Sequence, residues 1–329
     1  MTDNLPFEGI KREILVRKEA ETNPEHGKRP EERTTEELIQ YGVVNINKPS
    51  GPTSHQVSDF VKKILKVKKA GHSGTLDPRV TGVLPIALAK ATRVVQTLLT
   101  AGKEYICVMH IHKEVEETKV REVINEFIGE IEQLPPIKSA VKRQLRKRNI
   151  YYLNVIEIDG QDVLFKVGCQ AGTYIRKLAH DIGEKLGTGA HMAELIRTKA
   201  GPFSNETTVS LQDLKDAYTA WKEEGNDKEL RKIVQPMENA IQHLPKIWIF
   251  DTTIDSLAHG ANLSVPGIAK LESGINQGDM VAVLSLKGEL VALSDAVMNS
   301  QNIYMQEKGI ATKNRKVFYE RGIYPKFII

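Results

Sequence analysis

The thirteen residues at 70–82 constrain the fold of this chain more than any other segment. Gly71 and Gly74 can adopt positive φ at no steric cost, so the backbone is free to turn sharply there. Pro78 pushes the residue before it, Asp77, out of the helical region and into an extended conformation. A carboxylate held in a tight loop between apolar segments is typical of a group that has to be aimed. An Asp-Pro turn whose backbone cradles a phosphate is the alternative interpretation.

The segments on either side of this loop have clear periodicities. Apolar residues recur at helical spacing from Val57 to Leu65, and Ser54 is the expected N-cap of that helix. A continuous apolar run at 82–88 predicts a buried strand. The same kind of pattern predicts further elements elsewhere: strands at 105–111 and 163–169, and a helix at 175–182.

The length of 329 residues suggests two domains, or one domain with an appendage. Residues 1–40 mix acids and bases densely, and we interpret them as an extended arm. From 247 onward, short strand-like runs alternate with glycine-bearing turns, which is typical of a small barrel or sandwich. We therefore expect an arm at 1–40, a first domain at 41–245 and a β-rich domain at 246–329.

Positive charge is concentrated in two places. The formal net charge is only +4, which by itself says little about partners. However, six basic and no acidic residues lie at 138–148, and five lysines lie at 62–69, just before the Asp77 loop. One such run is usually a solvated helix face. Two runs, one of them leading into the loop, indicate contacts with phosphate groups.

Several protein classes are disfavoured by the sequence. No apolar run approaches the ~18 residues that cross a bilayer and no apolar signal region is evident, so a cytoplasmic location and no membrane partner are expected. Cys107 and Cys169 are the two cysteines, expected as buried free thiols. Zinc-ligand spacing is lacking, and His110 with His112 would need a third ligand. Residues 71–75 do not fit a phosphate-binding P-loop, so we expect no metal and no cofactor.

Four motifs together resemble those of the TruB family of pseudouridine synthases, in particular the archaeal relatives of dyskerin. They are the loop at 70–82, Lys-Pro-Ser-Gly-Pro-Thr-Ser at 48–54, Lys-Glu-Tyr at 103–105 and Gly-Thr-Tyr-Ile-Arg at 172–176. The resemblance extends over nearly the whole chain. It implies an α+β fold with a mixed, mainly antiparallel sheet in the catalytic domain, followed by a small β-rich PUA domain that binds RNA. It also implies that the N-terminal arm packs on the PUA domain.

The reaction implied by this resemblance breaks the bond from ribose C1′ to uracil N1, turns the base and rejoins it through C5. Nothing is oxidised and no group is imported, so a well-placed ionised carboxylate suffices. By resemblance, Asp77 is this catalytic carboxylate. Arg176 would pair with it and favour its charged form in a partly buried position. By resemblance, Tyr105 would stack on the target base and would also take part in proton transfer. Without the resemblance, Arg176 would be interpreted as a surface residue and Tyr105 as a core residue.

Other residues are implied to bind the substrate, a uridine swung out of its stack. His72 would lie near the displaced base, although a histidine that only fixes the loop by a hydrogen bond is the alternative. Tyr174 and Leu195 would line the pocket, and Lys48 would support the active loop. Four basic side chains of the 138–148 run resemble part of a mobile thumb loop and are called the basic quartet here: Lys142, Arg143, Arg146 and Lys147. Their phosphate contacts are expected to add affinity without reading sequence.

Two RNA substrates are compatible with the resemblance. One is uridine 55 in the TΨC arm of tRNA, modified by the protein alone. The other is rRNA uridines chosen by H/ACA guide RNA, within a ribonucleoprotein that contains small partner proteins. A non-catalytic RNA-binding scaffold is the rival from a different class, and the joint presence of Asp77, Tyr105 and Arg176 argues against it. A PUA-bearing transglycosylase would need zinc ligands, and a PUA-bearing methyltransferase a glycine-rich cofactor loop.

Overall fold

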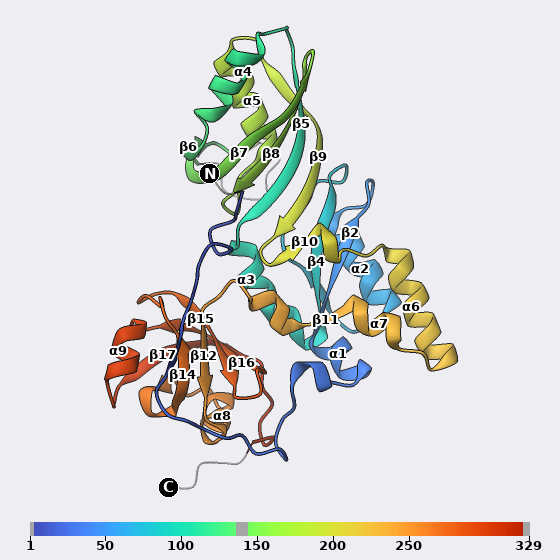
Figure 1. Cartoon of the computed structure of the whole chain (residues 1–329). Coiled ribbons are helices and arrows are strands. Elements are labelled where there is room, and N and C mark those ends of the chain that lie inside the picture. The colour runs from blue at the N-terminus through green and yellow to red at the C-terminus, as the bar shows by residue number, and fades with distance from the viewer. Residues whose placement is uncertain (1–2, 136–143, 325–329) are drawn as a thin grey trace.

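The computed structural model describes residues 3–135 and 144–324, which form two sheets with helices packed around them (Figure 1). The larger sheet has ten strands. Its central path, read from one edge to the other, is β11 (Val234–Pro236), β2 (Gly42–Lys48), β4 (Thr81–Leu88), β9 (Ala190–Ala200), β5 (Lys103–Ile111), β8 (Asp162–Cys169), β7 (Arg146–Asp159) and β6 (Gly129–Gln133). Two short strands lie off this path: β3 (Ala70–His72) pairs with β4, and β10 (Phe203–Ser204) pairs with β9.

The smaller sheet has seven strands and forms the C-terminal domain. Its order is β1 (Ile14–Val16), β14 (Ile268–Glu272), β12 (Lys246–Ile249), β15 (Met280–Ser285), β16 (Leu290–Ala296), β17 (Ile310–Val317) and β13 (Leu263–Ser264). Among the strands of the described residues, all pairings are antiparallel except those of β4 with β9 and β12 with β15. The predicted α+β class, with a mainly antiparallel sheet and a β-rich second domain, is therefore confirmed.

The helices cover the sheets in three groups (Figure 1). Against β2 and β4 lie α1 (Thr35–Tyr41), α2 (Ser54–Ile64), α6 (Leu211–Glu224) and α7 (Lys228–Ile233). Around β5 to β8 lie α4 (Glu117–Asn125) and α5 (Ile175–Leu186), while α3 (Val95–Thr100) faces the C-terminal domain. That domain contains α8 (Asp251–Ala258) and α9 (Ser300–Met305). Short 3-10 segments are found at Pro30–Glu32, Ala89–Val94, Asn205–Thr207, Met237–Ile241 and Val265–Gly267.

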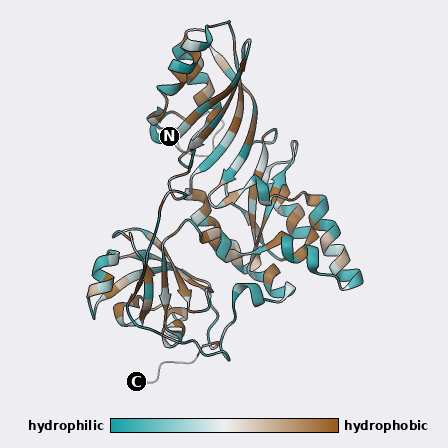
Figure 2. Ribbon diagram, in the orientation of Figure 1, coloured by the Kyte–Doolittle hydropathy of each residue, from teal (hydrophilic) through white to brown (hydrophobic). Residues whose placement is uncertain are grey.

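Apolar residues form buried clusters between these layers, and the segments that carry them are brown in Figure 2. One core fills the space between β5, β8 and α5, and includes the free thiols Cys107 and Cys169, which are buried as predicted. Another core joins the two domains, since Leu98 and Met237 of the first share a cluster with Leu284 of the second. This shared core holds the C-terminal domain against the end of the large sheet.

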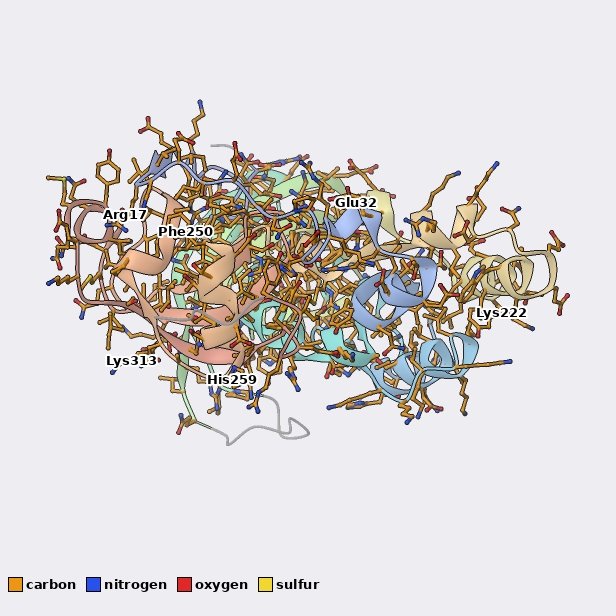
Figure 3. All side chains as sticks on the ribbon, turned by 90° about the horizontal axis from the view of Figure 1, so that it is seen from below. Arg17, Glu32, Lys222, Phe250, His259 and Lys313 are labelled. Carbon is orange, nitrogen blue, oxygen red and sulfur yellow. The ribbon has the colours of Figure 1, made fainter. Side chains whose placement is uncertain are left out.

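The N-terminal arm contacts both domains. Its strand β1 extends the C-terminal sheet by pairing with β14. Arg17, labelled in Figure 3, follows this strand, and its guanidinium donates to the carbonyls of Val265 at 2.5 Å and Gln306 at 2.7 Å. Nearer the N-terminus, Leu5 is fully buried against the first domain, and α1 adds Leu38 to that domain's core. The boundaries at 1–40, 41–245 and 246–329 stay a prediction.

One predicted helix start is wrong by a residue. The N-cap of α2 is Thr53, whose hydroxyl accepts from the Gln56 N–H at 3.2 Å while the Gln56 side chain accepts from the Thr53 N–H at 2.8 Å. This reciprocal pair is a capping box. Ser54 is the predicted N-cap, but its hydroxyl bonds to the backbone of Leu76 instead.

Candidate active site

The loop that carries Asp77 connects β3 to β4 at the centre of the large sheet. Gly74 has φ +131°, a conformation that L side chains rarely adopt. Asp77 then opens a tight turn in which the Val80 N–H donates to the Asp77 carbonyl at 3.0 Å, with Pro78 at the second position. The carboxylate therefore lies at the start of a rigid turn, as its neighbours in the sequence predict.

Lys48 braces this turn from inside the protein. Its side chain lies at the end of β2 with 0% exposure, and its ammonium donates to the carbonyls of Pro49, Pro78 and Val80, each at 2.9 Å. Burial lowers the pKa of Lys48, and the nearby Asp77 charge opposes that shift. All three donors of the ammonium are used by backbone carbonyls, so the prediction that Lys48 supports the loop is confirmed.

Ser54 ties the start of α2 to the same loop. The Leu76 N–H, directly before Asp77, donates to the Ser54 hydroxyl at 2.8 Å, and the hydroxyl lies 3.2 Å from the Leu76 carbonyl. The Gly51 N–H also donates to the Pro78 carbonyl at 2.9 Å. The motif at 48–54 therefore contacts the backbone on both sides of the carboxylate.

Arg176 and Asp77 form an ion pair, with Nη2 of the arginine 2.7 Å from Oδ2 of the aspartate. Arg176 lies in the first turn of α5, and 99 positions of sequence separate the two residues. Their side chains are 63% and 55% exposed, so the expectation of a partly buried acid is wrong. An exposed pair contributes little to stability because water screens it. Its effect is to fix the orientation of the exposed carboxylate.

Tyr174 lies directly before α5, where the chain turns into the helix. Its N–H donates to Oε1 of Gln133 at 2.9 Å, and its carbonyl accepts from Nε2 of the same amide at 3.1 Å. Gln133 is buried at the end of β6. This side chain was not identified from the sequence, and it ties the backbone at Tyr174 to β6.

Tyr105 and Arg197 lie opposite one another on β5 and β9. Arg197 is 1% exposed; its Nε donates to the Val83 carbonyl at 2.7 Å and its Nη2 to the Gly74 carbonyl at 3.3 Å. Burial raises the pKa of the Tyr105 phenol, and the guanidinium opposes that rise by charge and hydrogen bonding. Arg197 was not singled out from the sequence, although it joins Tyr105 to the loop of Asp77.

His72 lies at the end of β3, partly buried, with its ring 4.7 Å from that of His55. The Gly74 N–H donates to its Nδ1 at 3.3 Å. Burial, reinforced by His55 and Arg197, lowers the pKa of His72 to about 4, so the ring is neutral at neutral pH. The hydrogen bond to Gly74 favours the alternative in which His72 fixes the loop, while contact with a displaced base stays a prediction.

Leu195 lies two residues before Arg197 on β9, opposite Cys107. It is partly buried and packs against the same core cluster as Tyr105. The structure therefore brings Leu195 and Arg197 to one face of β9 beside Tyr105, since side chains two positions apart share a face.

The basic quartet is only partly described. Lys142 and Arg143 lie outside the described residues. Arg146 and Lys147 begin β7, so this end of the expected thumb loop is strand. Lys147 forms an exposed ion pair with Glu130 across β6 and β7 at 2.7 Å. Arg146 and Lys147 are in a strand and not in a loop because they pair with β6, and burial alternates from residue to residue at the start of β7.

Two negative findings concern the described residues alone. No helix in them is long and apolar enough to cross a membrane. Within 3–135 and 144–324, no three His, Cys, Asp or Glu side chains are arranged to hold a metal ion.

Comparison with known proteins identifies the class. Family models cover most of the chain: "TruB family pseudouridylate synthase (N terminal domain)" at 62–175, "tRNA pseudouridylate synthase B C-terminal domain" at 176–242, "DKCLD (NUC011) domain" at 2–58 and "PUA domain" at 245–318. The chain belongs to the TruB family of pseudouridylate synthases and is an isomerase of that class. The flanking DKCLD and PUA matches agree with the predicted archaeal, dyskerin-related type.

Relatives that match along the whole chain support the same family membership. The "Probable tRNA pseudouridine synthase B" of Pyrococcus horikoshii is 60% identical over 319 residues, 96% of each chain, and that of Methanopyrus kandleri is 56% identical over 322 residues, 98% of this chain and 95% of the relative. A "Crystal Structure of a Cbf5-Nop10-Gar1 Complex" is similar at TM-score 0.95 with 57% identity, covering 98% and 99% of the two chains. A "Structure of H/ACA RNP bound to a substrate RNA containing 2'-deoxyuridine" is similar at TM-score 0.93 with 55% identity and the same coverage.

Proposed function

We propose that this protein converts uridine to pseudouridine in structured RNA with Asp77 as the catalytic carboxylate. Arg176 orients that carboxylate, and Tyr105 contacts the uracil. The observation that carries the assignment is the 2.7 Å ion pair between Arg176 of α5 and Asp77, whose loop is held by the buried Lys48. A scaffold-only site would not require an exposed aspartate to be oriented by an arginine from another element.

Three further residues are assigned to substrate binding on the basis of the family resemblance. His72, Tyr174 and Leu195 are assigned to the pocket of the everted base. Extruding a base costs a few kcal/mol, which contacts in such a pocket offset. The basic quartet is assigned to the phosphates of the RNA, where its contribution is to affinity and not to sequence choice.

Two substrates are assigned to one active site. Relatives named as tRNA pseudouridine synthase B support uridine 55 of tRNA as a target of the protein alone. The similarity to chains solved with Nop10 and Gar1, and in an H/ACA RNP with substrate RNA, supports guide-selected rRNA uridines as targets in a complex with small partner proteins. We place both activities in the cytoplasm.

The decisive experiment maps pseudouridine in tRNA and rRNA after incubation with the full chain, with and without guide RNA and partner proteins. Modification of uridine 55 by the chain alone, and of rRNA sites only with the matching guide, is the expected outcome. The Asp77→Asn variant is the control and should modify neither RNA. Binding of both RNAs without any modification would leave the scaffold as the better account.

A further inference from the structure

Arg197 is the largest fully buried side chain among the described residues, and its charge calls for an explanation. Burying an ionised group is costly unless other groups compensate. No carboxylate in the described part of the chain forms an ion pair with it. Its partners there are the carbonyls of Val83 and Gly74 and the phenol of Tyr105. A methyl-bearing residue is also excluded at Gly82, because a Cβ there would lie 2.2 Å from the Arg197 carbonyl.

Tyr105 lies opposite Arg197 in the register of β5 and β9, and a hydrogen bond between their side chains can have only one polarity. A guanidinium has N–H donors and no acceptor, so the phenol oxygen must accept from Arg197. The phenol O–H is then turned away from the guanidinium and is free to donate to another acceptor. Tyr105 is only partly buried, and the Asp77 charge is close enough to act on its ionisation. A phenol whose oxygen accepts from Arg197 therefore keeps its own O–H for a bound substrate.

The reaction needs a proton carrier of this kind. When the bond from C1′ to N1 breaks and the bond from C1′ to C5 forms, C5 must lose its proton. Uridine and pseudouridine are isomers, so N1 must gain one. A single phenol balances both steps if it gives its proton to N1 and takes the proton from C5. Between the two transfers it is a phenolate, which a fixed neighbouring cation stabilises.

We propose that Arg197 is a positioning residue that turns the Tyr105 O–H toward the bound uracil and stabilises the phenolate form of Tyr105 during proton transfer. This inference rests on the proposed placement of Tyr105 at the uracil. It differs from a purely structural role, in which Arg197 only holds the backbone at Gly74 and Val83. The two roles differ in one prediction: the rate loss caused by substituting Arg197 depends on the presence of the Tyr105 phenol only if Arg197 acts through it.

A double-mutant cycle separates them. The single-turnover rate of tritium release from uracil-5-tritiated RNA is measured at saturating full-length protein for Arg197→Met, Tyr105→Phe and the double variant. We expect Arg197→Met to lower the rate by roughly 10–100-fold with RNA affinity within a few-fold, the range of one acid–base contribution. In the Tyr105→Phe background the same substitution should cost less than about threefold, because the phenol is already absent.

Lys48→Met is the matched control, since it removes another buried cation that holds the same loop, here through the carbonyls of Pro49, Pro78 and Val80. Its rate loss should be the same in both backgrounds. Replacing Tyr105 by 3-fluorotyrosine, a more acidic phenol, should recover part of the rate lost in Arg197→Met. If Arg197→Met does not fold, Arg197→Lys is used; it keeps the charge, and its smaller loss should still depend on the phenol.

The outcomes separate two failures. An equal loss from the Arg197 variant in both backgrounds, with no recovery by fluorotyrosine, would show that Arg197 acts only through the loop backbone. That result overturns the inference and leaves the proposed function intact. A Tyr105→Phe variant with normal turnover would show that the phenol hydroxyl carries no proton, which also overturns the inference but leaves a ring contact with the uracil possible. Normal turnover by Asp77→Asn would instead overturn the proposed function.

Discussion

Lys48 offers the sharpest test of how the active loop is held. Lys48→Met keeps the length and apolar body of the side chain but removes the ammonium from the carbonyls of Pro49, Pro78 and Val80. The bond to Val80 is buried, and leaving that carbonyl unpaired costs about 1–3 kcal/mol. The other two are partly buried, so water replaces part of each bond at roughly 0.5–1 kcal/mol.

One effect acts in the opposite direction. Burial lowers the pKa of Lys48, which means that the folded protein bears a cost for the buried charge, and methionine relieves it. The net loss in free energy of unfolding is therefore expected to be about 2–4 kcal/mol, measured by urea denaturation at neutral pH. The effect on turnover should be larger, because the loop positions Asp77 and a shift near 1 Å costs about 100-fold in rate.

Lys103 provides the matched control. It is 5% exposed, and its ammonium donates to the carbonyls of Leu98, Leu99 and Ala101 at 2.8, 3.1 and 2.7 Å, which is the same chemistry at the end of α3. Lys103→Met should destabilise the fold by a similar amount, while single-turnover pseudouridylation stays within about tenfold of wild type. If the folded Lys48→Met protein turns over as well as the Lys103 variant, the loop does not need its brace and the reasoning fails.

Three further predictions concern the exposed pair, the RNA surface and a buried histidine. Asp77→Asn should abolish tritium release. Because the ion pair is exposed, RNA affinity should change by less than a few-fold and the free energy of unfolding by about 0.5 kcal/mol. Normal turnover would remove Asp77 from the mechanism. Neutralising the basic quartet should weaken RNA binding. The slope of log binding constant against log salt concentration should become shallower by up to ~0.7–0.9 for each phosphate that is no longer neutralised, and least for Lys147, which is paired with Glu130. An unchanged slope would show that the quartet is only a solvated face. Burial lowers the pKa of His243 to about 4 in the folded protein, against ~6.5 in the unfolded chain. Between these two values the unfolded chain binds more protons than the folded protein. The stability that the neutral histidine gives is therefore fully present above pH 6.5 and falls toward pH 4. His243→Gln, which keeps a donor for the Thr97 carbonyl, should remove about 2 kcal/mol of the loss between pH 7 and pH 5, and an identical pH dependence in both proteins would contradict this.

Local sequence patterns were sufficient for the elements and for the loop. The apolar run at 82–88 became β4, and the helical spacing that ends near Leu65 became α2, because burial of a continuous or periodic apolar face decides both. The N-cap of α2 was misplaced although the signal was present: Thr53 and Gln56 have capping-box spacing, whereas the Ser54 hydroxyl bonds to Leu76. Two adjacent hydroxyl residues compete for one cap, and the long-range partner of Ser54 decided the outcome.

Long-range contacts were beyond the sequence alone. Arg197 reaches Gly74 across 123 positions, and Gln133 reaches Tyr174 across 41. Nothing in the segment around either side chain marks it as functional, since an arginine in a strand is usually an exposed residue. The register of β5 against β9 places Arg197 opposite Tyr105, and that register depends on irregularities that local periodicity does not reveal.

Asp77 is more exposed than the sequence analysis predicts. The resemblance implies a partly buried acid paired with Arg176, yet the buried groups are the cations behind the loop and not the acid on it. Lys48 and Arg197 hold the loop through backbone carbonyls, which leaves the carboxylate at the surface within reach of a large RNA substrate. Substitution of a brace should therefore lower stability and rate together, whereas substitution of Asp77 or Arg176 should lower the rate at nearly unchanged stability. That separation distinguishes an aspartate aimed by its backbone from one poised by desolvation.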